Sequence, residues 1–487
     1  MRTNAIYCGD CENVLGDTTE FPDGFYHAYA APPPSRDPVT VTDLAESNPF
    51  PPSSVNVGVA RAKYARPTRD PRRLRRADSS WDFRGDDTKY ATHGIYRYPA
   101  MMVAPVVRRL IEEYSPVTDG GRLLDPFCGS GSALVEGMLH GMTTTGVDLN
   151  PLAVILARVK TTPLSVPAIR LEHQAILRRF DDTPTAPVNV DIQSIGFWYS
   201  KRSVSELSRL RSAIHRTRPD GMARFFELCF AETARYVSFT RKDEYKTYRM
   251  PEEKRKDWKP SVLASFAKVV AHNSERMADF VKCLPEGVPP ATVIEGDVRS
   301  PAILSERSYD MIITSPPYGD SRTTVAYGQY SSLGLRWLGY DTATVNRTDR
   351  ESLGGRPAPK LTPLPDSPTL SRHLSEIRAK DPPRARDVLS FYTDLCEAFR
   401  RVAAMLAPGG RACVVVGNRT VKGVRLETDV ILSELFEHEC GLRHRETIVR
   451  GIPNKLMPLR NSPSNVSGEL GETMANEYIL ILDRPKT

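Results

Sequence analysis

The arrangement of apolar segments between residues 122 and 160 constrains the fold of this chain more than any other feature of its sequence. Two segments read as short buried strands, RLLD (122–125) and TTTGVD (143–148). They alternate with two segments of helical character, SALVEGMLHG (132–141) and PLAVILARVK (151–160). Strands that alternate with helices at this spacing indicate parallel strands joined by helical crossovers. The segment therefore predicts an α/β fold with a doubly wound, mostly parallel sheet.

The same alternation returns after residue 290. Four further segments read as strands: ATVIEGD (291–297), YDMIITSPPY (309–318), RACVVVG (411–417) and EYILIL (477–482). Apolar residues at helical spacing predict helices at about 386–406 and 427–438. The second group of strands is expected to complete the sheet that the first group begins.

The residues between the two groups, 161–290, are mainly of helical character. Helices are expected at 203–217, 221–235 and 260–281. Because this block is too long for a loop and interrupts the sheet pattern, we interpret it as a helical insertion that is available for substrate recognition.

The remaining boundaries follow from composition. Residues 1–89 form a Pro- and Arg-rich extension that is expected to be partly disordered. The α/β domain then has two halves, 90–160 and 291–487. A segment with Gly, Pro, Arg and Ser, 319–380, is expected to be rich in loops within the second half.

The net charge of the 487-residue chain is +7, and its basic residues are concentrated in two stretches. One lies between residues 60 and 77: Arg61, Lys63, Arg66, Arg69, Arg72, Arg73, Arg75 and Arg76. The other, 241–259, mixes arginine and lysine with Tyr245, Tyr248 and Trp258. Such stretches can neutralise phosphates. A solvated linker and a solvated helical surface are equally good interpretations.

Other features narrow the class of protein. The sequence contains no run of the roughly 18 apolar residues that a membrane span needs, and its N-terminus has no secretory signal pattern, so we expect a cytoplasmic protein. The eight cysteines are scattered. Cys8 and Cys11 form a C-x-x-C pair without a second pair, so we expect reduced thiols and no metal site.

Four loops at the ends of predicted strands carry the candidate chemistry, because open α/β sheets bind ligands beyond the carboxyl ends of their strands. The first loop is Asp125-Pro126-Phe127-Cys128-Gly129-Ser130-Gly131. Its two glycines would let the backbone approach a ligand closely. It has no Gly-Lys-Ser/Thr sequence, which excludes a Walker loop. A tight strand-to-helix turn without a ligand is the alternative.

The second and third loops each end in an aspartate. Asp148 lies 17 residues after Gly131, near the spacing at which an acidic residue binds ribose hydroxyls. A helix N-cap is the alternative, for which Asn150 is the better candidate. Asp297 ends the strand TVIEG and could accept a hydrogen bond from an adenine amino group, or it could merely cap a turn.

The fourth loop is Thr314-Ser315-Pro316-Pro317-Tyr318, directly after a predicted strand. Two consecutive prolines fix the backbone and remove two N–H donors, so carbonyl oxygens remain there as acceptors. Ser315 adds a hydroxyl and Tyr318 an aromatic face. Acceptors beside an aromatic ring suit an exocyclic NH2 group of a stacked base.

Taken together, DPFCGSG, GVDLNP and TSPPY resemble the motifs of DNA amino-methyltransferases, the family that forms N4-methylcytosine or N6-methyladenine. The Ser-Pro-Pro-Tyr form is typical of the cytosine-N4 branch. Three further stretches resemble that branch: THGIYRYPA (92–100), YGDSRTTVAYGQ (318–329) and IPNKLMPLRNSPSNV (452–466). The resemblance spans roughly residues 90–160 and 290–485.

The resemblance implies a Rossmann-like class I S-adenosylmethionine-dependent methyltransferase fold, with 90–160 as its cofactor half and 291–487 as its catalytic half. S-adenosylmethionine would be bound by Asp125, Pro126, Phe127, Gly129 and Gly131, by Asp148 at the ribose, by Asp297 at the adenine, and by a wall formed around His93, Tyr98 and Pro99. Ser315 and Pro316 would accept hydrogen bonds from the target NH2 group, with Pro317 and Tyr318 completing the catalytic loop and Tyr318 stacking on the base.

The implied partner is double-stranded DNA with a flipped cytosine, in a restriction-modification system whose cognate restriction enzyme is a candidate partner. Three alternatives remain open: an adenine-N6 methyltransferase, a tRNA guanine-N2 methyltransferase, and a DNA-binding module without catalysis. The oligomeric state and the recognised DNA sequence are not predicted.

Overall fold

A central eight-stranded sheet forms from the described part of the chain. The computed structural model describes residues 69–118, 120–242, 244–304, 308–320, 327–356, 364–452, 460–461, 471–472 and 474–486. The strands are β1 (Arg75–Ala77), β2 (Arg122–Asp125), β3 (Thr143–Asp148), β4 (Thr292–Glu295), β5 (Tyr309–Thr314), β6 (Leu406–Gly417), β9 (Arg443–Gly451) and β12 (Asn476–Asp483). Their order across the sheet is β1-β9-β12-β6-β5-β2-β3-β4.

The strand order reverses at the centre of the sheet. From β2 the chain builds outward through β3 and β4 on one side, and then returns to add β5 and β6 on the other. All these pairs are parallel, and only β12 runs antiparallel to its neighbours β6 and β9. The doubly wound, mostly parallel sheet is confirmed, and its reversal point between β2 and β5 is where such sheets bind ligands.

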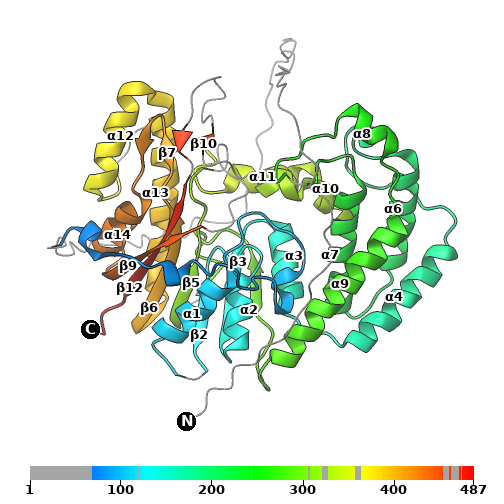
Figure 1. The fold of residues 1–487 in the computed structure, drawn as a ribbon, viewed down its shortest axis with the longest axis horizontal. Helices are drawn as coiled ribbons and strands as arrows, with labels where there is room; N and C mark the ends of the chain where they lie inside the picture. Colours follow the sequence, from blue (N-terminus) through cyan, green and yellow to red (C-terminus); the bar gives the residue numbers. More distant parts are fainter. Residues whose placement is uncertain are drawn as a thin grey trace, which may run out of the picture. The chain divides into compact units, whose positions relative to one another are not determined.

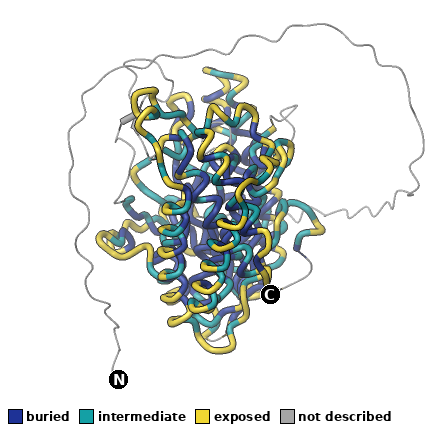
Figure 2. Tube along the Cα trace, turned by 90° about the vertical axis from the view of Figure 1, so that its right-hand side faces the viewer, coloured by how far each residue is buried: buried dark blue, intermediate teal, exposed yellow. Residues whose placement is uncertain are grey.

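Helices cover both faces of the sheet (Figure 1). One face packs on α1 (Ala104–Tyr114), α2 (Ser132–Leu139) and α3 (Pro151–Lys160), and the other on α13 (Pro382–Ala404) and α14 (Thr428–Glu439). Adjacent residues of β2 show the division, since Leu123 joins the first cluster and Leu124 the second. Side chains alternate along a strand, so both faces are buried, as Figure 2 shows for the interior.

A block of helices extends from the β3–β4 side of the molecule. It contains α4 (Val166–Asp181), α5 (Ile195–Trp198), α6 (Lys201–Ile214), α7 (Asp220–Val237), α8 (Glu252–Asp257) and α9 (Val262–Cys283). Buried Phe225, Phe226, Phe230, Phe266 and Phe280 form much of its core. The helical character that the sequence predicts for 161–290 is therefore present. That this block is a separate domain stays a prediction.

The segment 319–380 is more helical, where it is described, than its composition indicated. The segment contains α10 (Tyr327–Leu338), α11 (Thr342–Glu351) and α12 (Pro368–Lys380). The glycines of this segment were interpreted as a sign of loops, but in α10 they allow the helix to pack closely against its neighbours. A Cβ on Gly334 would lie 3.3 Å from the Cβ of Ala231 in α7. Tertiary packing of this kind outweighs the low helix propensity of glycine.

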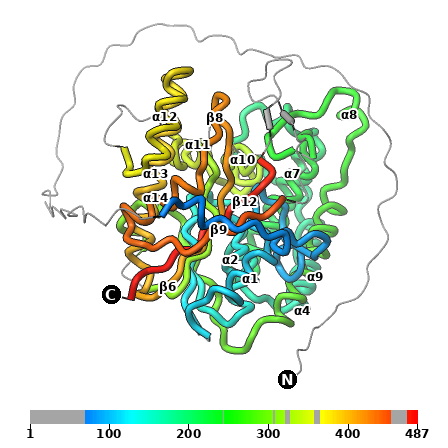
Figure 3. The backbone as a smooth tube through the Cα atoms, turned by 60° about the vertical axis from the view of Figure 1, so that its left-hand side comes forward, coloured from blue at the N-terminus to red at the C-terminus, as the bar shows by residue number. Residues whose placement is uncertain are grey.

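Ordered structure also begins earlier than the sequence indicated. Residues 71–89 were assigned to the extension, yet β1 pairs in parallel with β9 at the edge of the sheet, and Trp81 is fully buried. The first strand is short and rich in arginine, which conceals it from an apolar pattern. Residues 1–68 lie outside the described residues. The strand β9 was not predicted either, although it pairs with β12 over its length (Figure 3).

Two further expectations can be compared with the described chain. Its helices include none that is both long and apolar enough to cross a membrane. Its cysteines, Cys128, Cys229, Cys283, Cys396, Cys413 and Cys440, are all free thiols. Cys8 and Cys11 lie outside the described residues.

Replacing Trp81 tests whether the segment before residue 90 belongs to the folded domain. Trp81 packs edge-on against Phe83, and the Arg109 guanidinium lies 4.3 Å from its ring centroid. We expect Trp81→Ala to lower the free energy of unfolding by about 3–5 kcal/mol in chemical denaturation. Tyr248→Ala, at a 48% exposed residue, is the control and should change it by less than about 0.5 kcal/mol. Equal small effects would show that the segment adds nothing to stability.

Candidate active site

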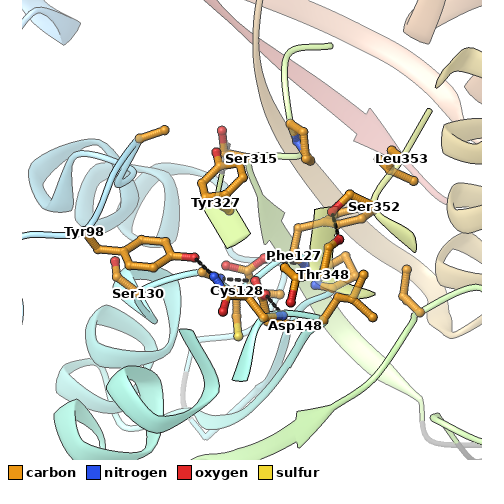
Figure 4. Close-up of a pocket in the computed structure, with 18 of the residues that line it drawn as sticks. Tyr98, Phe127, Cys128, Ser130, Asp148, Ser315, Tyr327, Thr348, Ser352 and Leu353 are labelled. Atoms are coloured by element: carbon orange, nitrogen blue, oxygen red, sulfur yellow. Dashed lines mark hydrogen bonds between the residues drawn. The ribbon is translucent and has the colours of Figure 1, made fainter. Parts of the chain in front are cut away.

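A cavity lies at the carboxyl ends of β2, β3, β4 and β5, where the sequence predicted that four loops meet. It encloses about 910 Å³, open space at its mouth included. Figure 4 shows Tyr98, Phe127, Asp148 and Ser315 around it, and all four loops contribute lining residues. Further lining comes from 98–102 before α1 and from α10 and α11. The position at the reversal of strand order is that of ligand sites in doubly wound sheets.

The first loop contributes backbone to the cavity at Gly129. This glycine has φ +47°, and the nearest atom to an added Cβ is Cε1 of Tyr98 at 3.9 Å. A Cβ there would be in ordinary contact with Tyr98 at the cavity wall, so it is the positive φ that favours glycine. Asp125, Pro126 and Phe127 also line the cavity.

Gly131, which the resemblance assigned to the cofactor, lies against α3 (Pro151–Lys160). It is not among the residues that line the cavity. Its φ is +78°, and an added Cβ would lie 3.1 Å from the Cβ of Ala157 in α3. Gly131 therefore allows the start of α2 to pack closely against α3, and its contact with the cofactor stays a prediction.

Asp148 lies at the end of β3, against the first loop. Its Oδ2 accepts a hydrogen bond from the Gly129 amide at 2.8 Å, and its Oδ1 accepts one from the Asn150 amide at 2.8 Å. Each carboxylate oxygen has two lone pairs, so each keeps one for a further donor. Asp148 is thus fixed in orientation and can still accept hydrogen bonds from two hydroxyls.

Asn150 is the N-cap of α3, as the sequence predicted. Its Oδ1 accepts a hydrogen bond from the Leu152 amide at 3.1 Å. Its Nδ2 donates to the Tyr98 hydroxyl at 2.9 Å and to Ser331 Oγ in α10 at 2.8 Å. Asn150 therefore also ties the wall residue Tyr98 and helix α10 to the end of β3.

Tyr98 and Pro99 line the cavity, and Tyr98 stacks on Tyr327 with ring centroids 6.0 Å apart. His93 does not reach this wall. Its Nε2 lies 2.8 Å from Glu136 Oε1 in α2, and both side chains are buried. His93 thus holds the segment before Tyr98 against α2.

The third loop brings Asp297 to the cavity together with an unpredicted arginine. Arg299 binds both carboxylate oxygens of Asp297, the closer at 2.6 Å, and also pairs with Asp394 of α13 at 3.0 Å. Other lining residues that the sequence did not indicate lie in α10, α11 and the chain after them: Tyr327, Thr348, Glu351, Ser352 and Leu353. No motif marks them, although Tyr327 lies in a stretch that resembles the family.

The fourth loop brings Ser315 and Pro317 to the cavity. Pro316 is buried, and neither it nor Tyr318 is a lining residue. The Ser315 hydroxyl donates to the Tyr318 hydroxyl at 3.3 Å, and the Tyr318 hydroxyl donates to Glu477 Oε1 at 3.1 Å. Buried Arg450 pairs with the other oxygen of Glu477 at 2.9 Å. This chain of partners, from β9 and β12, was not predicted.

The cavity is acidic and partly shielded from water. Burial raises the pKa of Asp148 to about 6 and that of Asp125 to about 7. Burial also raises the pKa of the Cys128 thiol, which keeps it neutral and unsuited to nucleophilic attack. Four carboxyl groups, on Asp125, Asp148, Asp297 and Glu351, line the cavity together with Arg299. Such a lining favours a cationic ligand.

Three arginines of the run before residue 77, Arg72, Arg75 and Arg76, form ion pairs within the fold, whereas Arg69 and Arg73 are exposed. Arg72 and Arg75 pair with Glu427 and Asp429 at the start of α14, with closest distances of 2.5 and 2.7 Å. Arg76 pairs with Asp78 and Glu446. These ion pairs hold β1 at the edge of the sheet. Arg61, Lys63 and Arg66 lie outside the described residues.

The sheet order, with antiparallel β12 between β6 and β9, and the cavity at the reversal point define the class of protein. It is a Rossmann-like class I S-adenosylmethionine-dependent methyltransferase. The cavity fits the cofactor of this class. The acidic lining suits its sulfonium, the free lone pairs of Asp148 suit two ribose hydroxyls, and Phe127, Val298 and Leu353 offer apolar surface to the adenine.

Comparison with known proteins gives the family. The chain is 35% identical over 422 residues to the type II methyltransferase M.MvaI of Kocuria varians, which covers 82% of this chain and 92% of that protein. It is 21% identical over 458 residues to the type II methyltransferase M.BsoBI of Geobacillus stearothermophilus, covering 81% and 86%. The chain belongs to the type II methyltransferases, a family of DNA methyltransferases.

Other comparisons add less. No family model matches the chain. A stretch of 53 residues, 11% of this chain, is 42% identical to the tRNA (guanine(10)-N2)-dimethyltransferase of Methanothermobacter thermautotrophicus. Among solved structures, the rRNA methyltransferase AviRa of Streptomyces viridochromogenes covers 80% of this chain and 87% of its own at 12% identity, with a TM-score of 0.28. A TM-score this low does not establish a shared fold, and the fold class follows from the order of the strands in the sheet.

The raised pKa of Asp148 makes cofactor affinity depend on pH. A carboxyl whose pKa in the folded protein is about 6 is ionised at pH 8 and largely protonated at pH 5. If only the ionised form accepts both hydroxyls well, the Kd for S-adenosylmethionine should rise about tenfold between pH 8 and pH 5. Isothermal titration calorimetry would measure this. In Asp148→Asn the affinity should be low at pH 8 and depend less on pH than in wild type, with Asp125 as the remaining titrating carboxyl of the cavity; wild-type affinity in that variant would contradict the assignment.

Proposed function

We propose that this protein methylates the exocyclic N4 amino group of cytosine in double-stranded DNA, as the modification enzyme of a restriction-modification system. The observation that carries the proposal is that Ser315 and Pro317 line the same cavity as Gly129 and Asp148. One cavity is therefore lined both by Ser315, one of the two predicted acceptors of an amino group, and by the predicted cofactor loop. The Ser-Pro-Pro-Tyr form of the catalytic loop favours cytosine over adenine.

The proposed roles of the cofactor residues follow from their positions. Asp125, Pro126, Phe127 and Gly129 enclose the methionine part, with Tyr98 and Pro99 as the opposite wall. Asp148 binds the ribose hydroxyls. Asp297 binds the adenine amino group through the carboxylate lone pairs that do not accept hydrogen bonds from Arg299. When bound, the cofactor supplies an electrophilic methyl group on a sulfonium.

The chain's own residues would activate the base nitrogen. An exocyclic amino group is a weak nucleophile because its lone pair is delocalised into the ring. Ser315 Oγ and the Pro316 carbonyl would accept hydrogen bonds from the amino protons as the nitrogen becomes tetrahedral. Hydrogen bonds that strengthen in the transition state accelerate the reaction. No covalent bond between enzyme and base is needed, which agrees with the neutral, buried Cys128.

The hydrogen bonds behind Ser315 support its role as an acceptor. A carboxylate can only accept, so Glu477 takes the Tyr318 hydrogen, and the Tyr318 oxygen then takes the Ser315 hydrogen. The Ser315 hydrogen thus points away from the substrate, and its lone pairs remain for the amino group. Tyr318 is also the residue proposed to stack on the flipped base; its half-buried ring lies beside Gly417 of β6.

Product analysis tests the proposed function. The protein is incubated with S-adenosylmethionine carrying a labelled methyl group and either double-stranded DNA or tRNA, and the nucleosides are then separated. We expect labelled N4-methylcytosine from DNA and no label in tRNA. N6-methyladenine or N2-methylguanine as the product would instead establish one of the two enzymatic alternatives, and no transfer would leave only a binding function.

Replacing Ser315 should separate chemistry from binding. In Ser315→Ala we expect kcat to fall by about 10²–10³, because one acceptor that acts in the transition state is lost. The affinity for S-adenosylmethionine should stay within twofold of wild type, since no predicted cofactor contact changes. Turnover close to that of wild type would remove Ser315 from the catalytic group.

Replacing only the Tyr318 hydroxyl tests the hydrogen-bond chain separately from stacking. Tyr318→Phe keeps the ring but leaves the Ser315 hydroxyl free to point its hydrogen at the substrate. We expect kcat to fall about five- to tenfold with little change in KM for DNA, as for the loss of one hydrogen bond. Tyr236→Phe, at a 47% exposed residue, is the matched control. An unchanged kcat in Tyr318→Phe would show that the hydroxyl has no role.

A further inference from the structure

A second cavity lies between the helical block and the helices α10 and α11. Figure 1 shows these two helices between the helical block and the sheet. It encloses about 850 Å³, open space at its mouth included. Its lining includes Gln193, Trp198, Thr247, Gln329, Arg336 and Asn346. These residues come from two regions, the insertion 161–290 and the segment 319–380.

The polar side chains of this second cavity have unused hydrogen-bonding groups. Gln193, Gln329 and Asn346 are exposed, and their amides form no hydrogen bond within the part of the chain that the structure describes. Nε of Arg336 is buried and has no partner among those residues. A side-chain amide offers a donor and an acceptor together. A donor and an acceptor side by side match the edge that a base presents in the major groove. Adenine fits best, because it presents its N6 amino donor beside its N7 acceptor.

The second cavity is mixed in charge, since Arg336 and Asp349 both line it, and a basic stretch lies beside it. Thr247 lies within the basic and aromatic stretch 241–259, and its hydroxyl donates to the Gln329 carbonyl at 3.1 Å. Exposed Lys246 precedes it, and the Arg249 guanidinium lies 4.0 Å from the Phe197 ring centroid. Cations held beside base-reading amides are the composition of a surface that contacts phosphates and base edges.

The second cavity shares a wall with the cofactor cavity. In α10, Tyr327 lines the cofactor cavity and Gln329 the second one. In α11, Thr348 lines the first and Asn346 the second. A helix with its side chains is about 10 Å thick. Successive bases along one strand of DNA are about 3.4 Å apart, so the shared wall corresponds to about three base steps.

We propose that the second cavity reads the edge of one base pair of the DNA recognition sequence, within about three base pairs of the methylated base. Gln329 and Asn346 contact the base edge, and the basic stretch 241–259 contacts the neighbouring phosphates. This inference rests on the proposed function, because it assigns sequence specificity to the same enzyme.

The test compares the sequences that the enzyme methylates. Wild type, Gln329→Ala, Asn346→Ala and the double variant are incubated with S-adenosylmethionine and a DNA library of random sequence, and the methylated positions are sequenced. We expect the variants to lose discrimination at one position near the methylated base, by about 5- to 150-fold. Gln174→Ala, an exposed glutamine of α4, is the matched control and should leave the recognised sequence unchanged. Thermal melting and S-adenosylmethionine titration establish that each variant is folded.

The outcomes separate the two proposals. An unchanged recognition sequence in the double variant, with wild type active on DNA, overturns the reading site and leaves the proposed function intact. A folded double variant that loses activity equally on all sequences also overturns it, because a reading site must affect one position. Wild type that methylates RNA and not DNA overturns both proposals.

Discussion

The hydrogen bond between Thr314 and Asp125 is the contact on which the active site depends. Thr314 ends β5 and Asp125 ends β2, the two strands that meet where the sheet reverses its order. The Thr314 hydroxyl donates to Asp125 Oδ1 at 2.7 Å, and both side chains are buried. The residue after Thr314 is Ser315, and the residues after Asp125 form the cofactor loop. One buried contact therefore fixes the two loops to each other.

A second layer of support comes from residues that never touch the cavity. Gly131 allows α2 to pack against α3. Glu477 of β12, which pairs with Arg450 of β9, accepts the hydrogen bond of the Tyr318 hydroxyl. Removing Glu477 would lower the stability of the fold, because it would leave the buried charge of Arg450 without its partner. The active loops are thus held by groups from strands that lie far apart in the sequence.

The sequence predicted those parts of the structure that local patterns determine. β2 and β3 begin and end where the apolar segments indicated, since each strand meets a glycine or proline turn directly. Asn150 is the N-cap that its position before Pro151 suggested. Parts that depend on tertiary contacts were missed: α10 is built around glycines that pack on other helices, and β1 is an arginine-rich edge strand held by ion pairs. The role of Tyr327 in the cavity could not be predicted, because it depends on where α10 packs.

The most direct test is a structure of the enzyme with S-adenosylhomocysteine and its DNA substrate. We expect the sulfur near Gly129, a ribose hydroxyl on Asp148, and a flipped cytosine whose amino nitrogen lies about 2.7–3.2 Å from Ser315 Oγ. A cofactor bound elsewhere than in the cavity bounded by Gly129 and Asp148, or a target base bound away from Ser315, would contradict the proposed active site.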